Sequence, residues 1–424
     1  MAASGGISGL VLLVRRSLRT HLLSTLVTIG SIALACGLSM AVFSVHAQAY
    51  SAFTGGQTGF DAVLGAHGSP LQLVLNAVFH LETSPGNISW KIYQAVKKDP
   101  RVELAVPYAV GDNYYGFRIV GTTDELFTKF EYQEGKKYKI AEGERFFDNR
   151  RREAVVGSFA AQQTGLKVGS VFNPFHGLYF NPNMKHTEEF VVVAVLEPTS
   201  SPADHVIWIP IEGVYRMKGH TNRDRATGVE YEAKAGEAIP DDNKEVSAVL
   251  IKFKSEELGK LMADEINLRS REATMAYPIG SVMAILFDKL GWAVKILQLV
   301  AYMVVAVAAG SILASIYNTM NERRREFAIL RALGARRTTV FSAIVAEAGT
   351  IALLGSLCGF AVYAVILSGA AWVIRDQTGV ALEMTQMHPA LWITPLGMTV
   401  LGALAGIIPA MKAYSTDVAG ALVQ

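Results

Sequence analysis

The chain contains very little cysteine. Its 424 residues include two, Cys36 and Cys358, and both fall inside long apolar segments. The large hydrophilic region between about residues 46 and 285 has none. A disulfide framework and a cysteine-ligated metal site are therefore excluded from that region.

The sequence also lacks the motifs of several enzyme classes. A phosphate-binding P-loop has the pattern Gly-x4-Gly-Lys-Ser/Thr, and no segment matches it. Gly135-Lys136 and Gly259-Lys260 lack both the upstream glycine and the following hydroxyl residue. No nucleophile-elbow serine, HExxH motif or pair of acids stands out. We therefore expect no catalytic residue and no cofactor in this chain, and no ATP hydrolysis by it.

Charged residues are scarce for a soluble protein. They make up 18% of the chain, against 51% hydrophobic residues, and the mean hydropathy is +0.28. This composition indicates a few membrane spans joined to one sizeable soluble domain. The formal net charge is +2, and no basic surface interleaved with aromatic residues is evident, so we expect no nucleic-acid partner.

Four apolar runs are long enough to cross a bilayer, which takes about 20 residues. They cover residues 22–45, 296–317, 340–365 and 391–411. A signal peptide is a rival interpretation of the first run, because Ala47-Gln-Ala49 resembles a cleavage site. The run is longer than a signal-peptide core of about 7–15 residues, however, so we interpret it as a retained span.

Arginine placement sets the expected topology. Arg15, Arg16 and Arg19 precede the first span, and further arginines lie between the second and third spans. Basic loops stay in the cytoplasm, which puts both termini inside. The expected order is a cytoplasmic segment (1–20), first span and stalk (21–48), outer domain (49–285), stalk and second span (286–320), short cytoplasmic helix (321–338), third span (339–372), short outer loop (373–389), fourth span (390–413) and cytoplasmic tail (414–424).

The outer region mixes strand and helix patterns. Alternating or β-branched runs predict strands, and amphipathic runs predict helices. The strands are expected at 102–110, 115–121, 153–156, 190–196, 205–210 and 246–253, and the helices at 89–98, 158–164 and 255–268. A polar run at 221–244 is interpreted as a loop or subdomain edge. The fold class is thus an α-helical membrane protein with four transmembrane helices and a large α+β extracytoplasmic domain inserted between helices 1 and 2.

The loop after the second span is the most informative segment. Residues 322–337 hold six arginines and two glutamates. Phe327, Leu330 and Leu333 are spaced three apart, which predicts a short amphipathic helix, and Gly334 is a plausible stop. Such a helix is suited to docking in a groove of another protein. Glu347 is the one acid of the third span. We expect it to pair with an arginine of this loop or to lie near the membrane interface, a transport role being the alternative.

The order Glu-Arg-Arg-Arg-Glu-Phe-Ala-Ile-Leu-Arg-Ala-Leu-Gly-Ala of this loop closely resembles that of MacB/FtsX-like (type VII) ABC transporter permeases. Weaker similarities follow in the right order along the chain, at 119–127, 153–158, 164–169 and 406–414. Some members carry a fused ATPase, and this chain departs from them. The resemblance implies an inner-membrane permease subunit with a two-lobed periplasmic domain.

The resemblance also implies partners. A separate cytoplasmic ABC ATPase dimer would bind ATP and Mg²⁺, and a second copy of this chain would complete the membrane domain as a homodimer. A periplasmic adaptor or lipoprotein would bind outside, and membrane lipids would surround the spans. The loop residues expected to contact the ATPase are Glu322, Arg323, Arg324, Arg325, Glu326, Phe327, Leu330, Arg331, Leu333 and Gly334.

Histidine is concentrated outside the membrane. Seven of nine histidines fall in the outer regions and His46 lies at the outer end of the first span. Imidazole is a common metal ligand, but no pair has a tight local spacing, so we interpret them as scattered and expect no metal site. The apolar segment 60–80, which contains His67 and His80, is interpreted as an amphipathic helix packed on the membrane or on a second protomer. It also resembles a subgroup for which metal-related transport has been suggested.

Three functions stay open. In the first, ATP-driven motion is transmitted to the periplasmic domain (mechanotransmission) for substrate export or periplasmic handling. The second is lipoprotein handling or metal-related (zinc) transport with a periplasmic partner. The third is a transducer that regulates a cell-wall hydrolase without transport. The sequence does not choose between them.

Overall fold

The computed structural model describes residues 4–55, 59–133, 135–220, 231, 237–382 and 387–415. Most of the polar run at 221–244 and part of the loop at 373–389 lie outside these residues. The chain divides into two compact units. The helical unit is Met1–Gln48, Leu290–Trp372 and Glu383–Gln424, and the α+β unit is Ala49–Lys289 and Val373–Leu382.

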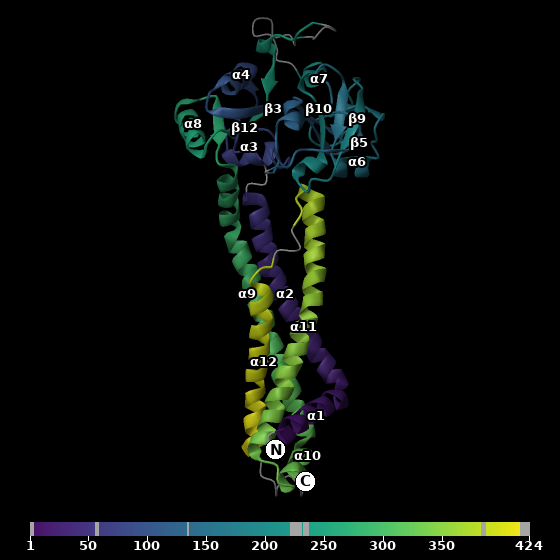
Figure 1. Cartoon of the computed structure of the whole chain (residues 1–424), viewed down its shortest axis with the longest axis vertical. Helices are drawn as coiled ribbons and strands as arrows, with labels where there is room; N and C mark the ends of the chain where they lie inside the picture. Colours follow the sequence, from purple (N-terminus) through teal and green to yellow (C-terminus); the bar gives the residue numbers. More distant parts are fainter. Residues whose placement is uncertain are drawn as a thin grey trace. The chain divides into compact units, whose positions relative to one another are not determined.

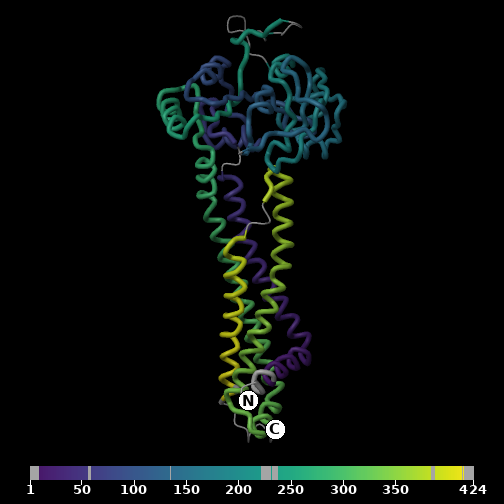
Figure 2. Tube along the Cα trace, viewed as in Figure 1, coloured from purple at the N-terminus to yellow at the C-terminus, as the bar shows by residue number. Residues whose placement is uncertain are grey.

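Among the described residues, the helical unit has four long apolar helices with shorter helices beside them (Figure 1). The long helices are α2 (Leu22–Thr54), α9 (Ile279–Glu322), α11 (Arg337–Thr378) and α12 (Ala390–Ser415), and the short ones are α1 (Ser4–Thr20) and α10 (Arg324–Ala332). Each predicted span lies inside one long helix, and all four helices are long and apolar enough to cross a membrane. Within the unit, α1, α10 and the carboxyl end of α12 lie at the same end (Figures 1 and 2).

Small residues set the close packing of these helices. A methyl group at Gly359 of α11 would lie 2.9 Å from Cβ of Cys36 on α2, and one at Gly406 of α12 would lie 2.6 Å from Cβ of Ala348. Glycines spaced four apart let helix backbones approach closely, which is a common way for membrane helices to associate. Both cases belong to such pairs, since Gly355 and Gly402 stand four residues earlier.

The α+β unit contains an 11-stranded sheet whose main order is β13-β1-β12-β3-β4-β10-β6-β9-β5. The strands are β1 (Ala62–Ala66), β3 (Val102–Tyr114), β4 (Phe117–Thr122), β5 (Ile140–Gly143), β6 (Glu153–Val156), β7 (Val171–Phe172), β8 (Phe175–His176), β9 (Phe190–Leu196), β10 (Val206–Pro210), β12 (Ala248–Phe253) and β13 (Ala273–Ala276). A separate pair is β2 (Ile88–Ser89) with β11 (Glu245–Val246). The helices are α3 (Pro70–Ala77), α4 (Trp90–Lys98), α5 (Glu125–Thr128), α6 (Ser158–Thr164), α7 (Ile211–Tyr215) and α8 (Glu256–Arg269), with 3₁₀ turns η1 (Pro182–Met184), η2 (Pro202–His205) and η3 (Asp241–Asn243).

One long strand joins the two halves of this sheet. Residues 102–108 of β3 pair with β12, and residues 109–114 pair with β4. In Figure 1, α3, α4 and α8 lie beside the first half, and β5, β9 and α6 lie in the second. The two lobes implied by the resemblance therefore share a continuous strand.

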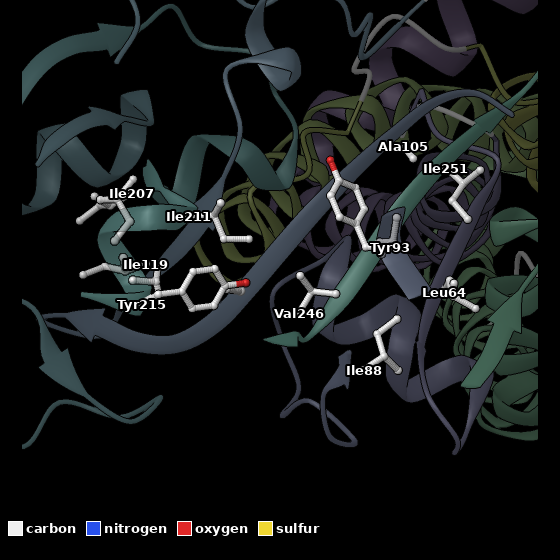
Figure 3. Packing of buried hydrophobic residues seen from close by; sticks show 14 of the residues in the cluster. Leu64, Ile88, Tyr93, Ala105, Ile119, Ile207, Ile211, Tyr215, Val246 and Ile251 are labelled. Carbon is white, nitrogen blue, oxygen red and sulfur yellow. The ribbon is translucent and has the colours of Figure 1, made fainter. Parts of the chain in front are cut away.

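Each face of the sheet carries its own hydrophobic core. Side chains alternate along the strands, so Val206 and Trp208 of β10 point to one core while Ile207 and Ile209 point to the other. Figure 3 shows the second core, with Ile207 among the residues on one side of the view and Leu64, Ile88 and Ile251 among those on the other. Burial on both faces explains the nearly continuous apolar runs in the sequence.

One sequence interpretation of this unit is wrong. Segment 60–80 is not a single amphipathic helix; it forms β1, inside the sheet between β12 and β13, and then α3, which starts after the N-cap Ser69. Its β-branched and small residues at 62–66 pair on both sides, and this pairing outweighs any local helical tendency.

The expected short outer loop at 373–389 is helical at its start. Residues 373–378 continue α11, and Val373–Leu382 belong to the α+β unit. Gly379 ends the helix with a φ of +73°, Val380 and Leu382 are buried, and the Ala381 amide donates to the Ser200 carbonyl at 3.3 Å. This apolar burial holds Val380 and Leu382 against the rest of the α+β unit.

Candidate functional sites

The first candidate site is α10, the helix between α9 and α11. It covers Arg324–Ala332, and Gly334 follows with a φ of +100°, a backbone conformation that favours glycine. The predicted short helix and its stop are therefore confirmed. Its charged side chains are mostly exposed, while Phe327 and Leu330 are half-buried.

The apolar stripe predicted on α10 is only partly available to a partner. Leu333 is 80% exposed and Ile329 is 46% exposed, whereas Ala328 is buried within the chain. Exposed arginines at its start and an exposed leucine just after its last residue give α10 a mixed apolar and basic surface. Arg324 and Arg325 are both exposed at its first turn.

Arg323 differs from its neighbours because it lies inside the helical unit. It is 9% exposed, and its guanidinium donates to the Ser17 hydroxyl at 2.6 Å and lies 3.4 Å from a carboxylate oxygen of Glu347. Ser17 in turn donates to Glu347. The Nε of Arg323 also contacts Glu326 at 3.1 Å. The pairing expected for Glu347 is confirmed, and Arg323 is committed to contacts within the chain.

We call Ser17, Arg323 and Glu347 the buried triad. It joins three helical segments, because Ser17 lies on α1, Arg323 immediately precedes α10, and Glu347 lies on α11. A second contact at the same junction joins His21 to Glu322 at 3.1 Å. Of the residues expected to contact an ATPase, Arg323 is therefore the one that the structure turns inward.

The second candidate site was not expected from the sequence. Asp112, His176, His186 and His220, which we call the histidine cluster, lie with their ligand atoms within 4.8 Å of one another. The aspartate comes from the β-bulge of β3, His176 from β8, and the other two from segments after η1 and α7. The interpretation of scattered histidines is wrong for these three.

The histidine cluster centres on a buried carboxylate. The imidazole nitrogens of His176, His186 and His220 lie 3.3, 3.3 and 3.2 Å from the oxygens of Asp112. The Asp112 side chain is 3% exposed. Burial alone would raise its pKa, but hydrogen bonds from the three imidazoles outweigh burial and hold the pKa well below its usual range. The same carboxylate raises the pKa of His176.

The other outer histidines have separate surroundings. His67 contacts the Thr274 hydroxyl at 3.2 Å, His205 stacks on Phe159 with ring centroids 4.1 Å apart, and His388 accepts from the Ala390 amide. Burial lowers the pKa of His80 to about 3, so that it is neutral at pH 7. The sequence shows no short spacing between the cluster residues, because they are 64, 10 and 34 residues apart along the chain.

The chain matches the models of two known protein families. The model of the MacB-like periplasmic core domain matches residues 25–249, more than half of the chain, and the model of the FtsX-like permease C-terminal matches residues 299–418. An uncharacterized ABC transporter permease of Methanocaldococcus jannaschii is 25% identical over 283 residues, which cover 64% of this chain and 61% of that relative. The match therefore spans less than two thirds of the relative's length.

Two solved structures are also similar. The extracellular domain of the noncanonic ABC-type transporter YknZ from Gram-positive bacteria is 14% identical, with a TM-score of 0.29, covering 51% of this chain and 99% of that domain. The periplasmic region of MacB from Actinobacillus actinomycetemcomitans is 10% identical, with a TM-score of 0.33, covering 55% and 94%. On the family matches, this chain is a membrane-embedded ABC transporter permease of the MacB/FtsX type.

Proposed function

We propose that the chain is the permease subunit of an ABC system whose separate cytoplasmic ATPase docks on α10. The observation that carries this proposal is that α10 is exposed, basic and partly apolar, and that the residue before it, Arg323, forms a buried ion pair with Glu347. Leu333, Arg324 and Arg325 form the docking surface. The chain has no P-loop of its own, so ATP and Mg²⁺ would be bound by the partner.

The buried triad supports mechanotransmission in this proposal. A force on α10 reaches α1 through Arg323 and Ser17, and reaches α11 through Arg323 and Glu347. These contacts are short and enclosed, so α10 cannot shift without moving or breaking them. ATP-driven movement of the partner would thus be passed to the long helices, and by them to the periplasmic domain.

The orientation belongs to the same proposal. Both termini and α10 face the cytoplasm, because arginines are concentrated before α2 and around α10. The test is to replace Arg336 with cysteine in a chain whose Cys36 and Cys358 are replaced by serine. Labelling by a membrane-impermeant maleimide only after the membrane is opened supports this orientation, and labelling of intact cells contradicts it.

Two copies are proposed to form the membrane domain. Only 28% of the most apolar stretch of α9 and 17% of that of α12 are buried within one chain. A second copy related by a twofold axis would cover part of this apolar surface, and lipid would cover the rest. Mass measurement of the intact complex in a lipid nanodisc checks the stoichiometry.

The docking test uses substitutions on the exposed surface of α10. The variant Arg324→Glu, Arg325→Glu, Leu333→Asp reverses two charges and removes one apolar anchor. If each contact is worth about 1 kcal/mol, ATPase binding weakens by roughly 100-fold. The measurement is affinity purification of the full chain from native membranes, followed by ATPase assays of the complex.

The matched control is Arg271→Glu, which reverses an exposed arginine of the α+β unit. This control should co-purify as much of the partner ATPase as the wild type does. Recovery of equal ATPase with the triple variant, while the protein remains folded, would remove α10 as the docking surface.

A further inference from the structure

The four members of the histidine cluster face one another across a small space. Besides their contacts with Asp112, the nitrogens of His176 and His220 lie 3.4 Å apart, and those of His220 and His186 lie 3.3 Å apart. The same nitrogen of each ring makes both the contact with the carboxylate and the contact with the neighbouring ring. The convergence therefore involves one ligand atom per histidine.

Hydrogen bonding cannot satisfy all of these contacts at once. Each ring nitrogen that donates to Asp112 must carry a hydrogen, and a nitrogen that carries a hydrogen cannot accept from the next ring. Three imidazoles donating to one carboxylate would bring N–H groups of adjacent rings to face each other. A cation at the centre removes this conflict, because all four ligand atoms then direct lone pairs at it.

The contact distances are close to those of a tetrahedral site. The edge of a regular tetrahedron is about 1.63 times the distance from its centre to a corner, so zinc–ligand bonds of about 2.0–2.1 Å require ligand atoms about 3.3–3.4 Å apart. Four contacts lie in this range: His176 and His186 are each 3.3 Å from Oδ1 of Asp112, and His220 is 3.4 Å from His176 and 3.3 Å from His186. His220 lies 3.2 Å from the other carboxylate oxygen, and all the ligand atoms lie within 4.8 Å of one another. Three imidazoles and one carboxylate are also a ligand set that zinc accepts.

The surroundings hold these ligands in place. The Asn113 side chain, fully buried, donates to the carbonyls of Phe175 and Gly177 at 3.3 and 2.9 Å, which fastens the His176 segment to β3. Asn173 donates to the carbonyls of Thr187 and Glu188 and closes the loop that carries His186. The backbone segments that carry His176 and His186 are therefore held in place by hydrogen bonds from Asn113 and Asn173.

The residues around the three histidines also suit a bound metal. The second nitrogen of His186 lies 3.9 Å from the Glu188 carboxylate, the kind of partner that orients a metal-bound imidazole. His186 and His220 are 8% and 9% exposed, whereas His176 is 43% exposed. An ion could thus enter and leave on the side of His176.

We propose that Asp112, His176, His186 and His220 form a tetrahedral zinc-binding site in the periplasmic domain. The ion fastens the 173–188 loop and the segment after α7 to β3, the strand that joins both halves of the sheet. This site is independent of ATPase docking on α10. The unfolded chain does not hold the four ligands together, so the metal binds only to the folded chain. Metal binding therefore also stabilises the domain.

The test uses the full chain in detergent, stripped with EDTA and dialysed. Zinc sulfate is titrated in competition with a chromophoric chelator, and one zinc ion per chain is expected. His186→Ala and His220→Ala should each lower zinc affinity by at least about 10–100-fold. The matched control His67→Ala changes an exposed histidine outside the cluster and should bind zinc as the wild type does.

Two further measurements separate metal binding from folding. The melting temperature of each zinc-free variant reports whether it folds, and zinc should raise it for the wild type and His67→Ala only. Cobalt(II) in place of zinc should give the intense visible bands of a four-coordinate ion. Equal zinc affinity in the wild type and in folded cluster variants overturns the proposal, and a weak six-coordinate cobalt spectrum overturns the tetrahedral geometry.

Discussion

The buried triad of the helical unit and the histidine cluster of the α+β unit are assembled in the same way but differ in completeness. Each brings together polar side chains from distant parts of the chain. In the triad, the Arg323 guanidinium pairs with the Glu347 carboxylate and the Ser17 hydroxyl, so the buried acid has its cation within the chain. In the cluster, three imidazoles converge on one carboxylate and compete for it. A complete group fastens helices by itself, whereas an incomplete one is suited to receive an ion.

The strongest test of this comparison is to break the triad. Arg323→Met leaves the Glu347 carboxylate buried without its cation, which should destabilise the helical unit by about 3–5 kcal/mol. Denaturation in detergent measures the change. Zinc should have no influence on it, because the triad is complete without a metal.

A double substitution sharpens the same result. Arg323→Met with Glu347→Met removes both charges and should recover most of the lost stability, since the unpaired charge is gone. If the single and double variants are equally unstable, the ion pair is not what holds this junction.

A smaller effect is expected beside the histidine cluster. Asn113→Ala removes the donor that fastens the His176 segment and should cost about 1–3 kcal/mol of unfolding free energy. Zinc affinity should fall by roughly 10-fold although every ligand is retained. Chemical denaturation and zinc titration measure the two effects, and unchanged affinity in a destabilised variant would show that the ligands do not depend on this support.

The smallest effect on stability is expected on the exposed surface of α10. Leu333→Asp changes a side chain that is 80% exposed and should alter the unfolding free energy by no more than about 0.5 kcal/mol. Stimulation of the ATPase should nevertheless fall. Substitutions in the buried triad differ, because their main effect is on the unfolding free energy. A large loss of stability would mean that Leu333 packs inside the assembled chain.

Local patterns predicted much of this protein. The four apolar helices follow from runs of apolar residues, α10 and its end from its spacing and Gly334, and strands such as β6 and β9 from β-branched runs. These features depend on residues within a few positions of one another, which is why the sequence carries them. The pairing of Glu347 was predicted too, because an acid in an apolar span requires a partner.

Tertiary structure decided what depends on long-range contacts. It turned Arg323 inward, placed residues 62–66 in the sheet, and ordered residues 373–382 against the α+β unit. It also brought His176, His186 and His220 to Asp112, although no spacing in the sequence indicated it. The physical reason is that burial and ligand geometry depend on which strands and loops become neighbours, and strand pairing across a hundred or more residues leaves no periodic trace in the chain.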